Sequence, residues 1–252
     1  VVGLGYIGRP TAAIIARGGC TVRGVDVSQH VVDTINRGEI HIEEVDLDAL
    51  VQGVVNRGML SASTEVAAAD VFVVAVPTPF DKDHAPDISY VLAAGKAIAP
   101  VLKSGDIVIL ESTSPVGTTE QLRDMIAQMR PDLKCPGITR ETPDISIAYC
   151  PERVLPGHVL RELVRNDRVI GGLTAKCSQA AVEQDQRDDE RPLAAGPRVQ
   201  PDAAQGYQRK EQRADPKVAL AVGVGDLAFF RVPHRVGFHD GSRLWGAVRC
   251  AL

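Results

Sequence analysis

The sequence predicts an α/β fold with a doubly wound parallel sheet, followed by a poorly specified tail. Three observations lead to this prediction: a glycine-rich turn at residues 3–8, a regular alternation of segment types up to about residue 178, and a sharp change of composition beyond it. Short β-branched runs that alternate with helical segments are typical of βαβ units and a parallel sheet. We expect about six strands.

The expected elements follow one another in a simple order. Strands are predicted at 1–3, 21–27, 71–77, 106–113 and 145–150, and helical spacing occurs at 10–17, 31–37, 90–102 and 119–129. The run at 71–77 lacks polar alternation, as expected for a central strand that is buried on both faces. Residues 80–86 are polar and are predicted to form the loop after that strand.

The turn at residues 3–8 has the spacing of a dinucleotide-binding Rossmann fold. Gly3 permits the tight turn, Gly5 lets a pyrophosphate approach the backbone, and Gly8 allows close packing of helix on strand. The second strand runs into Asp26, close to the roughly 20-residue spacing at which an acid meets the ribose hydroxyls. An Asp there repels a 2′-phosphate, so we expect NAD rather than NADP as the cofactor.

Two neighbours of the turn bear on this prediction. Pro10 suits the first helical turn, where its missing N–H costs nothing. Arg9 places a cation beside the turn, where it either meets a phosphate or points to water. The first strand has only two residues ahead of Gly3, which is short for a central strand.

Bulk composition limits the class of protein. The net charge of −4 and the 4% of aromatic residues give no basis for binding nucleic acid or an acidic membrane surface. No apolar run approaches the roughly 20 residues that cross a bilayer. The five cysteines are odd in number and form no CxxC pair, which favours reduced thiols and a cytoplasmic location. No residues suggest a metal site: His234 and His239 have no third ligand.

The segment from about residue 181 onward differs from what precedes it. It is rich in Gln, Asp, Arg, Ala and Pro and lacks a sustained period of 2 or 3.6. Such a stretch has little apolar surface to offset its chain entropy, so we expect disorder. The run at 218–232 could form a strand or a short helix, but the sequence offers no partner for it. We therefore divide the chain into a domain at 1–178 and a divergent tail at 179–252.

Several ordered motifs together resemble the UDP-glucose/GDP-mannose dehydrogenase family. They are VVGLGYIGRPTAA, INRGEIHIEEVDLDAL, AVPTPFDKDHAPDISYV, ILESTSPVGTTE and YCPERVLPGHVLRELVRNDRVIGG. The resemblance covers about residues 1–180. It implies an NAD-binding Rossmann domain and the oxidation of a UDP-amino sugar, with UDP-N-acetyl-D-mannosamine as the best match, to a uronic acid used in bacterial surface polysaccharides.

The resemblance also implies roles for individual residues. Tyr6, Ile7, Asp26, Thr78 and Thr119 match positions that bind NAD. Both threonines follow strand ends, where open α/β sheets bind ligands. Without the resemblance, Thr78 would be a turn hydroxyl between two prolines.

A second set of implied roles concerns the sugar and its chemistry. Arg153 and Val154 match nucleotide-sugar-binding positions, and Glu152 matches an acid that manages water during hydrolysis of a thioester. Thr118 is expected to join the same water network. A carboxylate beside a reacting centre is a suitable acid or base. Taken alone, a Glu-Arg pair after a strand is more often a surface ion pair.

The implied reaction needs groups that this chain does not offer. The family oxidises an alcohol in two NAD-dependent steps through a thioester on a cysteine, which requires a thiol of lowered pKa. The family's glycine-rich cysteine motif is absent, and Lys210 and Lys217 match no catalytic helix. We therefore expect the family's dimerisation and UDP-binding domains to be missing. A shifted reading frame or a truncated gene would explain the change near residue 180, and translating the source DNA in other frames would test this.

Two further functions remain open from the sequence. One is a non-catalytic NAD-binding remnant or regulatory subunit, which would bind NAD without producing NADH. The other is a β-hydroxyacid dehydrogenase of similar fold, against which the PTP, SPVGTT and PERVLPG motifs argue. The resemblance implies a homo-oligomer.

Overall fold

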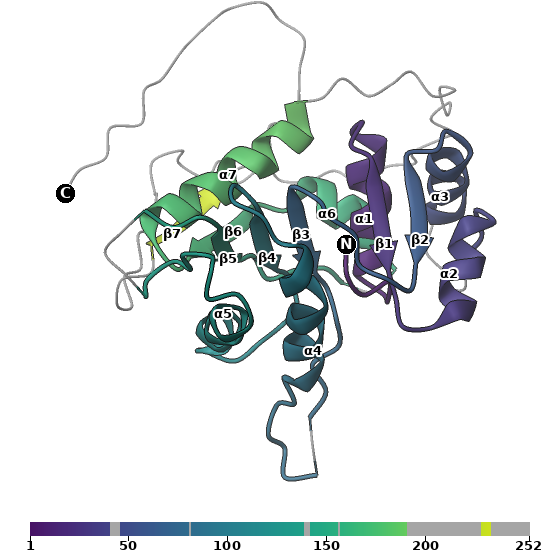
Figure 1. Cartoon of the computed structure of the whole chain (residues 1–252). Coiled ribbons are helices and arrows are strands. Elements are labelled where there is room, and N and C mark those ends of the chain that lie inside the picture. The colour runs from purple at the N-terminus through teal and green to yellow at the C-terminus, as the bar shows by residue number, and fades with distance from the viewer. Residues whose placement is uncertain (41–45, 81, 139–141, 156, 191–227, 233–252) are drawn as a thin grey trace, which may run out of the picture.

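Helices and strands alternate along most of the chain in the computed structural model (Figure 1). The structure describes residues 1–190, except 41–45, 81, 139–141 and 156, together with residues 228–232. The helices are α1 (Gly8–Arg17), α2 (Gln29–Asn36), α3 (Leu47–Asn56), α4 (Ser89–Ile98), α5 (Thr118–Met129), α6 (Val159–Arg165) and α7 (Ala175–Glu190), with a 3-10 turn at Ala99–Val101. The strands are β1 (Val22–Val25), β2 (Leu60–Ser63), β3 (Val71–Val74), β4 (Ile107–Leu110), β5 (Ser146–Tyr149), β6 (Arg168–Gly172) and β7 (Ala228–Val232).

The sheet consists of two parallel parts that meet at a single residue. β2 pairs with β1, and β3, β4 and β5 pair in that order, all in parallel. Val2 forms one parallel bridge to Val25 and another to Val74, so it joins the two parts. The first predicted strand is thus reduced to this bridge.

The far edge of the sheet differs from the prediction. β6 pairs with β5 in the antiparallel sense, and β7 pairs with β6 in the same sense. The predicted α/β class and its parallel sheet are confirmed, but the sheet is parallel only from β2 to β5. The run for which the sequence offered no partner contains β7, which is the partner of β6.

Helices cover both faces of the sheet. Figure 1 shows α4 and α5 on one side of it and α7 on the other. Phe72, Val74 and Leu110 belong to the buried cluster that includes residues of α4 and α5. Cys150, Ile170 and Ala181 form a smaller cluster under α7. This layering follows from the apolar strand sequences, because strands covered on both faces bury both sets of side chains.

The predicted start of the disordered tail was wrong for its first residues. α7 continues through Glu190, and Ala181 is completely buried. The proposed domain boundary at residue 178 therefore falls inside a helix. The sequence of α7 beyond residue 181 is strongly polar, but the helix packs against β5 and β6, and its Asp185 contacts Arg168. The rest of the predicted tail, residues 191–227 and 233–252, lies outside the described residues.

Candidate functional site

The glycine turn between Val2 and α1 is shaped by the absence of side chains. Gly3 has φ +91°, and a Cβ there would lie 2.5 Å from the carbonyl oxygen of Ala75. A Cβ on Gly8 would lie 1.8 Å from the carbonyl oxygen of Gly3. Both positions thus exclude any larger residue, as expected for a tight turn and for close packing of helix on strand.

Gly5 differs from its two neighbours in the motif. A Cβ there would meet no atom within 4 Å, so the turn is open on that side. α1 begins just beyond, and Ile7, at its N-cap, makes no side-chain cap. The first amides of a helix need acceptors, and a phosphate is a suitable one. The turn therefore fits the pyrophosphate of a dinucleotide.

Asp26 lies directly after β1 and binds the turn itself. Its Oδ2 accepts a hydrogen bond from the backbone N–H of Leu4 at 2.9 Å, and its Oδ1 accepts one from Ser28 at 2.9 Å. A carboxylate has about four acceptor sites, so both oxygens retain capacity for ribose hydroxyls. Ser28 in turn caps α2 by accepting a bond from Val31.

Arg9 does neither of the two things that the sequence left open. Its side chain is only 8% exposed, and its Nε donates to the carbonyl oxygen of Leu4. Burial lowers the pKa of Arg9, and nearby Asp26 partly opposes this. Arg9 is therefore a structural support of the turn.

The predicted threonines lie at the same edge of the sheet. Thr78 follows β3, and its hydroxyl donates to the carbonyl oxygen of Thr113, which follows β4. Thr118 and Thr119 open α5 and are buried. The Thr118 hydroxyl donates to the carbonyl oxygen of Pro115 at 2.8 Å and keeps its acceptor sites. Because parallel strands share one carboxyl edge, Gly3, Asp26 and these threonines gather there.

Two exposed valines at this edge were not singled out from the sequence. Val27 follows Asp26, Val116 precedes the start of α5, and each is 98% exposed. Apolar side chains fully in water beside a predicted cofactor site are suitable contacts for flat rings. The signal in the sequence was their position next to the motif residues, since neither takes part in strand periodicity.

The predicted sugar-binding segment follows β5. Arg153 donates from Nη2 to the carbonyl oxygen of Asp167 at 2.7 Å, while Val154 is half-buried. The backbone N–H of Gly157 donates to the Tyr6 hydroxyl at 3.0 Å, which joins this segment to the glycine turn. The segment that contains Arg153 and Val154 is thus bonded to Tyr6 through Gly157.

Glu152 is not one half of a surface ion pair. Its side chain is 11% exposed, and its charged neighbour is Arg168, with 3.7 Å between Oε2 and Nη1. Its Oε1 accepts a bond from the backbone of Arg153 at 2.9 Å. Burial raises the pKa of Glu152, and Arg168 opposes that rise. A carboxyl with a raised pKa suits proton transfer near neutral pH.

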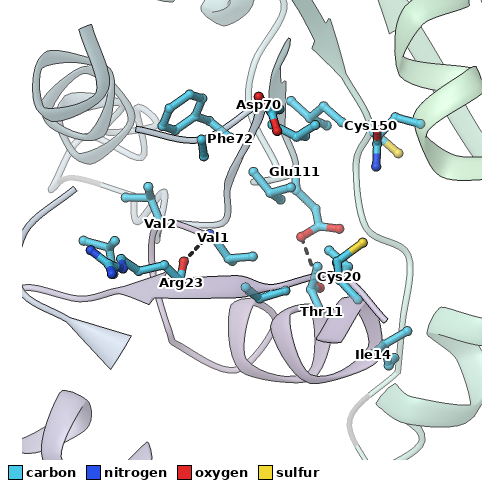
Figure 2. Close-up of a pocket in the computed structure, with 18 of the residues that line it drawn as sticks. Val1, Val2, Thr11, Ile14, Cys20, Arg23, Asp70, Phe72, Glu111 and Cys150 are labelled. Carbon is cyan, nitrogen blue, oxygen red and sulfur yellow. Dashed lines mark hydrogen bonds between the residues drawn. The ribbon is translucent and has the colours of Figure 1, made fainter. Parts of the chain in front are cut away.

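A buried charged cluster that the sequence did not predict lies next to Glu152. Arg168 on β6 bonds Glu111, which follows β4, at 2.9 Å, and contacts Asp185 of α7 at 3.3 Å. Glu111 is fully buried, and its Oε2 accepts a bond from Thr11 of α1 at 3.2 Å (Figure 2). Its residues are distant in sequence, so no local motif could reveal it.

A cavity of about 880 Å³ is separate from the glycine turn. It lies against the sheet beside α1 and α7, and Figure 2 shows Glu111, Cys150 and Thr11 in its wall. None of the predicted cofactor-binding or sugar-binding residues lines it. The cavity and the predicted cofactor site are therefore different places in the fold.

The cysteines of the described part do not resemble a nucleophile. Cys20, Cys135, Cys150 and Cys177 are free, and all but Cys20 are buried. Burial raises the pKa of Cys150 to about 11, and burial also raises the pKa of Cys135. A reactive cysteine needs the opposite shift. Cys250, Lys210, Lys217, His234 and His239 lie outside the described residues.

The described part of the chain has neither a metal-binding cluster nor a membrane-spanning helix. No group of three or more His, Cys, Asp or Glu side chains there could hold a metal ion. Within the same residues, no helix is long and apolar enough to span a bilayer.

Comparison with protein families gives a match over most of the chain. Residues 1–184 match the model of the UDP-glucose/GDP-mannose dehydrogenase family, NAD binding domain. The NDP-N-acetyl-D-galactosaminuronic acid dehydrogenase of Ralstonia nicotianae is 62% identical over 181 residues, which are 72% of this chain and 43% of that protein. The UDP-N-acetyl-D-mannosamine dehydrogenase of Escherichia coli is 59% identical over 183 residues, 73% of this chain and 44% of that protein.

Solved structures of nucleotide-sugar dehydrogenases are also similar to this chain. The UDP-N-acetyl-D-mannosamine dehydrogenase of Pyrococcus horikoshii is similar with a TM-score of 0.68 and 37% identity, over 74% of this chain and 44% of that one. The GDP-mannose dehydrogenase of Pseudomonas aeruginosa gives a TM-score of 0.67 at 27% identity, over 73% of this chain and 43% of that one. This chain thus spans less than half the length of the relatives it matches.

Proposed function

Because the chain belongs to the UDP-glucose/GDP-mannose dehydrogenase family and carries its NAD-binding domain, we propose that it is the cofactor half of a UDP-N-acetyl-D-mannosamine dehydrogenase. The observation that supports this most is the glycine turn, open at Gly5 and bonded to Asp26 through Leu4. NAD is the cofactor of this domain. A bound NAD would supply the hydride acceptor for each of the two oxidations, with one molecule of NAD consumed per step.

The residues of this chain have distinct tasks in the proposal. Asp26 accepts hydrogen bonds from the ribose hydroxyls, and its charge disfavours a 2′-phosphate. The amides of Tyr6 and Ile7 face the pyrophosphate. Thr78 and Thr119 line the same edge and orient the cofactor. These assignments follow from the resemblance and from the position of each residue at the carboxyl ends of the strands.

The sugar side of the site begins at the segment after β5. Arg153 and Val154 contact the nucleotide sugar, and Glu152 takes a proton from the water that cleaves the thioester. Thr118 holds that water through its free acceptor sites. Burial raises the pKa of Glu152, and this supports its role as a base, because a carboxylate of higher pKa binds a proton more strongly.

We propose that this chain alone binds NAD without turning over substrate. The nucleophile of the family is not among its described cysteines, whose pKa values are raised at Cys135 and Cys150. The chain matches less than half of these relatives, and we expect the contacts that distinguish one sugar epimer from another to lie in the other part. Because the relatives' names differ in the sugar, the assignment to mannosamine rests on the resemblance. A cytoplasmic location fits the free thiols of the described part.

Two measurements on one sample test the proposal. Calorimetry gives NAD binding, and absorbance at the NADH band follows addition of UDP-N-acetyl-D-mannosamine. Binding without NADH supports a cofactor domain without its catalytic half. NADH formation would contradict the proposal that this chain does not turn over substrate, and absence of NAD binding would refute the assignment of the glycine turn. A regulatory subunit gives the same first result, and activation of a full-length relative on mixing distinguishes it.

A further inference from the structure

A single guanidinium connects the ends of three strands with helix α7. Arg168 on β6 reaches Glu111 after β4 at 2.9 Å, Asp185 on α7 at 3.3 Å and Glu152 after β5 at 3.7 Å. Its Nε also lies 3.3 Å from the Sγ of Cys150. The Arg168 side chain is 19% exposed, so these contacts occur largely away from water.

Glu111 and Glu152 differ in the number of hydrogen bonds that hold their carboxylates. Glu111 is completely buried and also accepts a bond from Thr11, so its position is fixed from two sides. The Oε2 atom of Glu152 is buried and has no hydrogen bond in the described structure. The charge on that oxygen is therefore stabilised chiefly by Arg168 across 3.7 Å.

We infer that Arg168 is a positioning residue that keeps the Glu152 carboxylate in place and ionised at the end of β5. Glu111 anchors the guanidinium from behind, because the 2.9 Å bond and the Thr11 contact fix its orientation. This inference rests on the proposed function, in which Glu152 accepts a proton from water. It extends that function to a residue that was given no role from the sequence.

The charges around Glu152 set the direction of each effect. Burial raises the pKa of Glu152, Arg168 and Arg153 lower it, and Glu111 raises it. Asp185 and Cys150 face the same guanidinium and compete for it. An opposite charge at this range shifts a carboxyl pKa by about one unit or more, especially where water is excluded. Removing Arg168 therefore makes ionisation of Glu152 harder.

The test follows the titration of one carboxyl in the intact chain. Glutamate side chains are labelled with ¹³C, and the Glu152 resonance is identified by its loss in Glu152→Gln. In Arg168→Met we expect the Glu152 midpoint to rise by about one pH unit, a tenfold change in the acid constant. Arg130→Met is the control, because Arg130 forms a comparable ion pair with Asp132 at 2.7 Å that involves none of the cluster residues.

A second variant keeps the inference testable if Arg168→Met does not fold. Glu111→Gln keeps the size of the side chain and frees the guanidinium for Glu152, so the Glu152 midpoint should fall. A purely structural Arg168 would lower the melting temperature of Arg168→Met without moving the midpoint in either variant, and that result overturns the inference. NAD calorimetry on the unmodified chain is independent of this titration, so failure of the proposed function is distinguished.

Discussion

The carboxylate of Asp26 accepts a hydrogen bond from the backbone N–H of Leu4 at 2.9 Å, across 22 positions of sequence. The residue predicted to hold the ribose is thus also a support of the turn predicted to hold the pyrophosphate. One side chain therefore couples the two halves of the cofactor site.

Replacing Asp26 by Asn tests this double role. The variant keeps the shape of the side chain and loses its charge, and charged hydrogen bonds contribute about 1.5–3 kcal/mol. We expect NAD affinity to fall at least about tenfold and the ratio of NADP affinity to NAD affinity to rise. Calorimetry with each dinucleotide measures both, and an unchanged ratio would contradict the role assigned to the charge.

Alanine substitutions at Gly5 and Gly3 should affect NAD affinity and stability differently. In Gly5→Ala the new Cβ meets no atom within 4 Å, so we expect the free energy of unfolding to stay within about 1 kcal/mol while NAD affinity falls. In Gly3→Ala the Cβ would lie 2.5 Å from the Ala75 carbonyl oxygen, and we expect the free energy of unfolding to fall by more than about 2 kcal/mol. Urea unfolding and calorimetry give the two quantities.

Gly58→Ala is the matched control for backbone strain. Gly58 also has positive φ, at +68°, but no atom lies within 4 Å of a Cβ there. We expect Gly58→Ala to lower the free energy of unfolding by about 1 kcal/mol, which is the cost of placing alanine in the left-handed conformation alone. If Gly3→Ala lowers the free energy of unfolding no more than Gly58→Ala does, the close approach of Gly3 to Ala75 does not exclude a side chain at that position.

Cys150 should make the protein less stable in alkaline solution. Its pKa is raised to about 11 by burial, whereas an unfolded thiol titrates near about 8.5. Below that lower value both states are protonated and the thiol has no effect. Between the two values the unfolded state releases the proton first, so stability falls by up to about 1.4 kcal/mol per pH unit. Urea midpoints from pH 8 to 11 should fall less steeply in Cys150→Ala, and equal slopes would refute the assignment.

Docking of α7 beyond residue 178 can be tested at Ala181. This side chain is completely buried against Cys150 and Ile170, so Ala181→Asp places a carboxylate in an apolar contact. We expect a loss of at least about 2 kcal/mol of unfolding free energy. Glu183→Ala, at an exposed position of the same helix, should change stability by less than about 0.5 kcal/mol. Equal effects would favour the boundary at residue 178.

The sequence was sufficient for the parts of the fold whose signals are local. The buried run that became β3, the helix after Gly8 and the polar loop after Phe80 all followed from spacing and residue type. β2 was not identified because LSAS has one large apolar residue, and β6 was not identified because it ends in two glycines. The antiparallel edge was unpredictable, because β6 and β7 are far apart in sequence.

In the candidate site, too, contacts within a local motif could be predicted from the sequence, whereas contacts between distant strands could not. Gly3, Gly8 and Asp26 have contacts that follow from a short motif and its neighbouring strand. The surroundings of Glu152 do not, because Arg168 reaches it from another strand. Arg9 shows the same limit: whether its side chain turned inward to Leu4 depended on packing that no spacing rule describes.

The two parts of the sheet meet at Val2, directly beside the glycine turn. Val2 bonds Val73 and Ala75 on the β3 side, while its neighbours Val1 and Gly3 bond Val25 on the β1 side. The turn that follows Val2 therefore starts at the junction of the two parts. A dinucleotide bound to the folded turn would stabilise this junction, and with it the position of β1 beside β3.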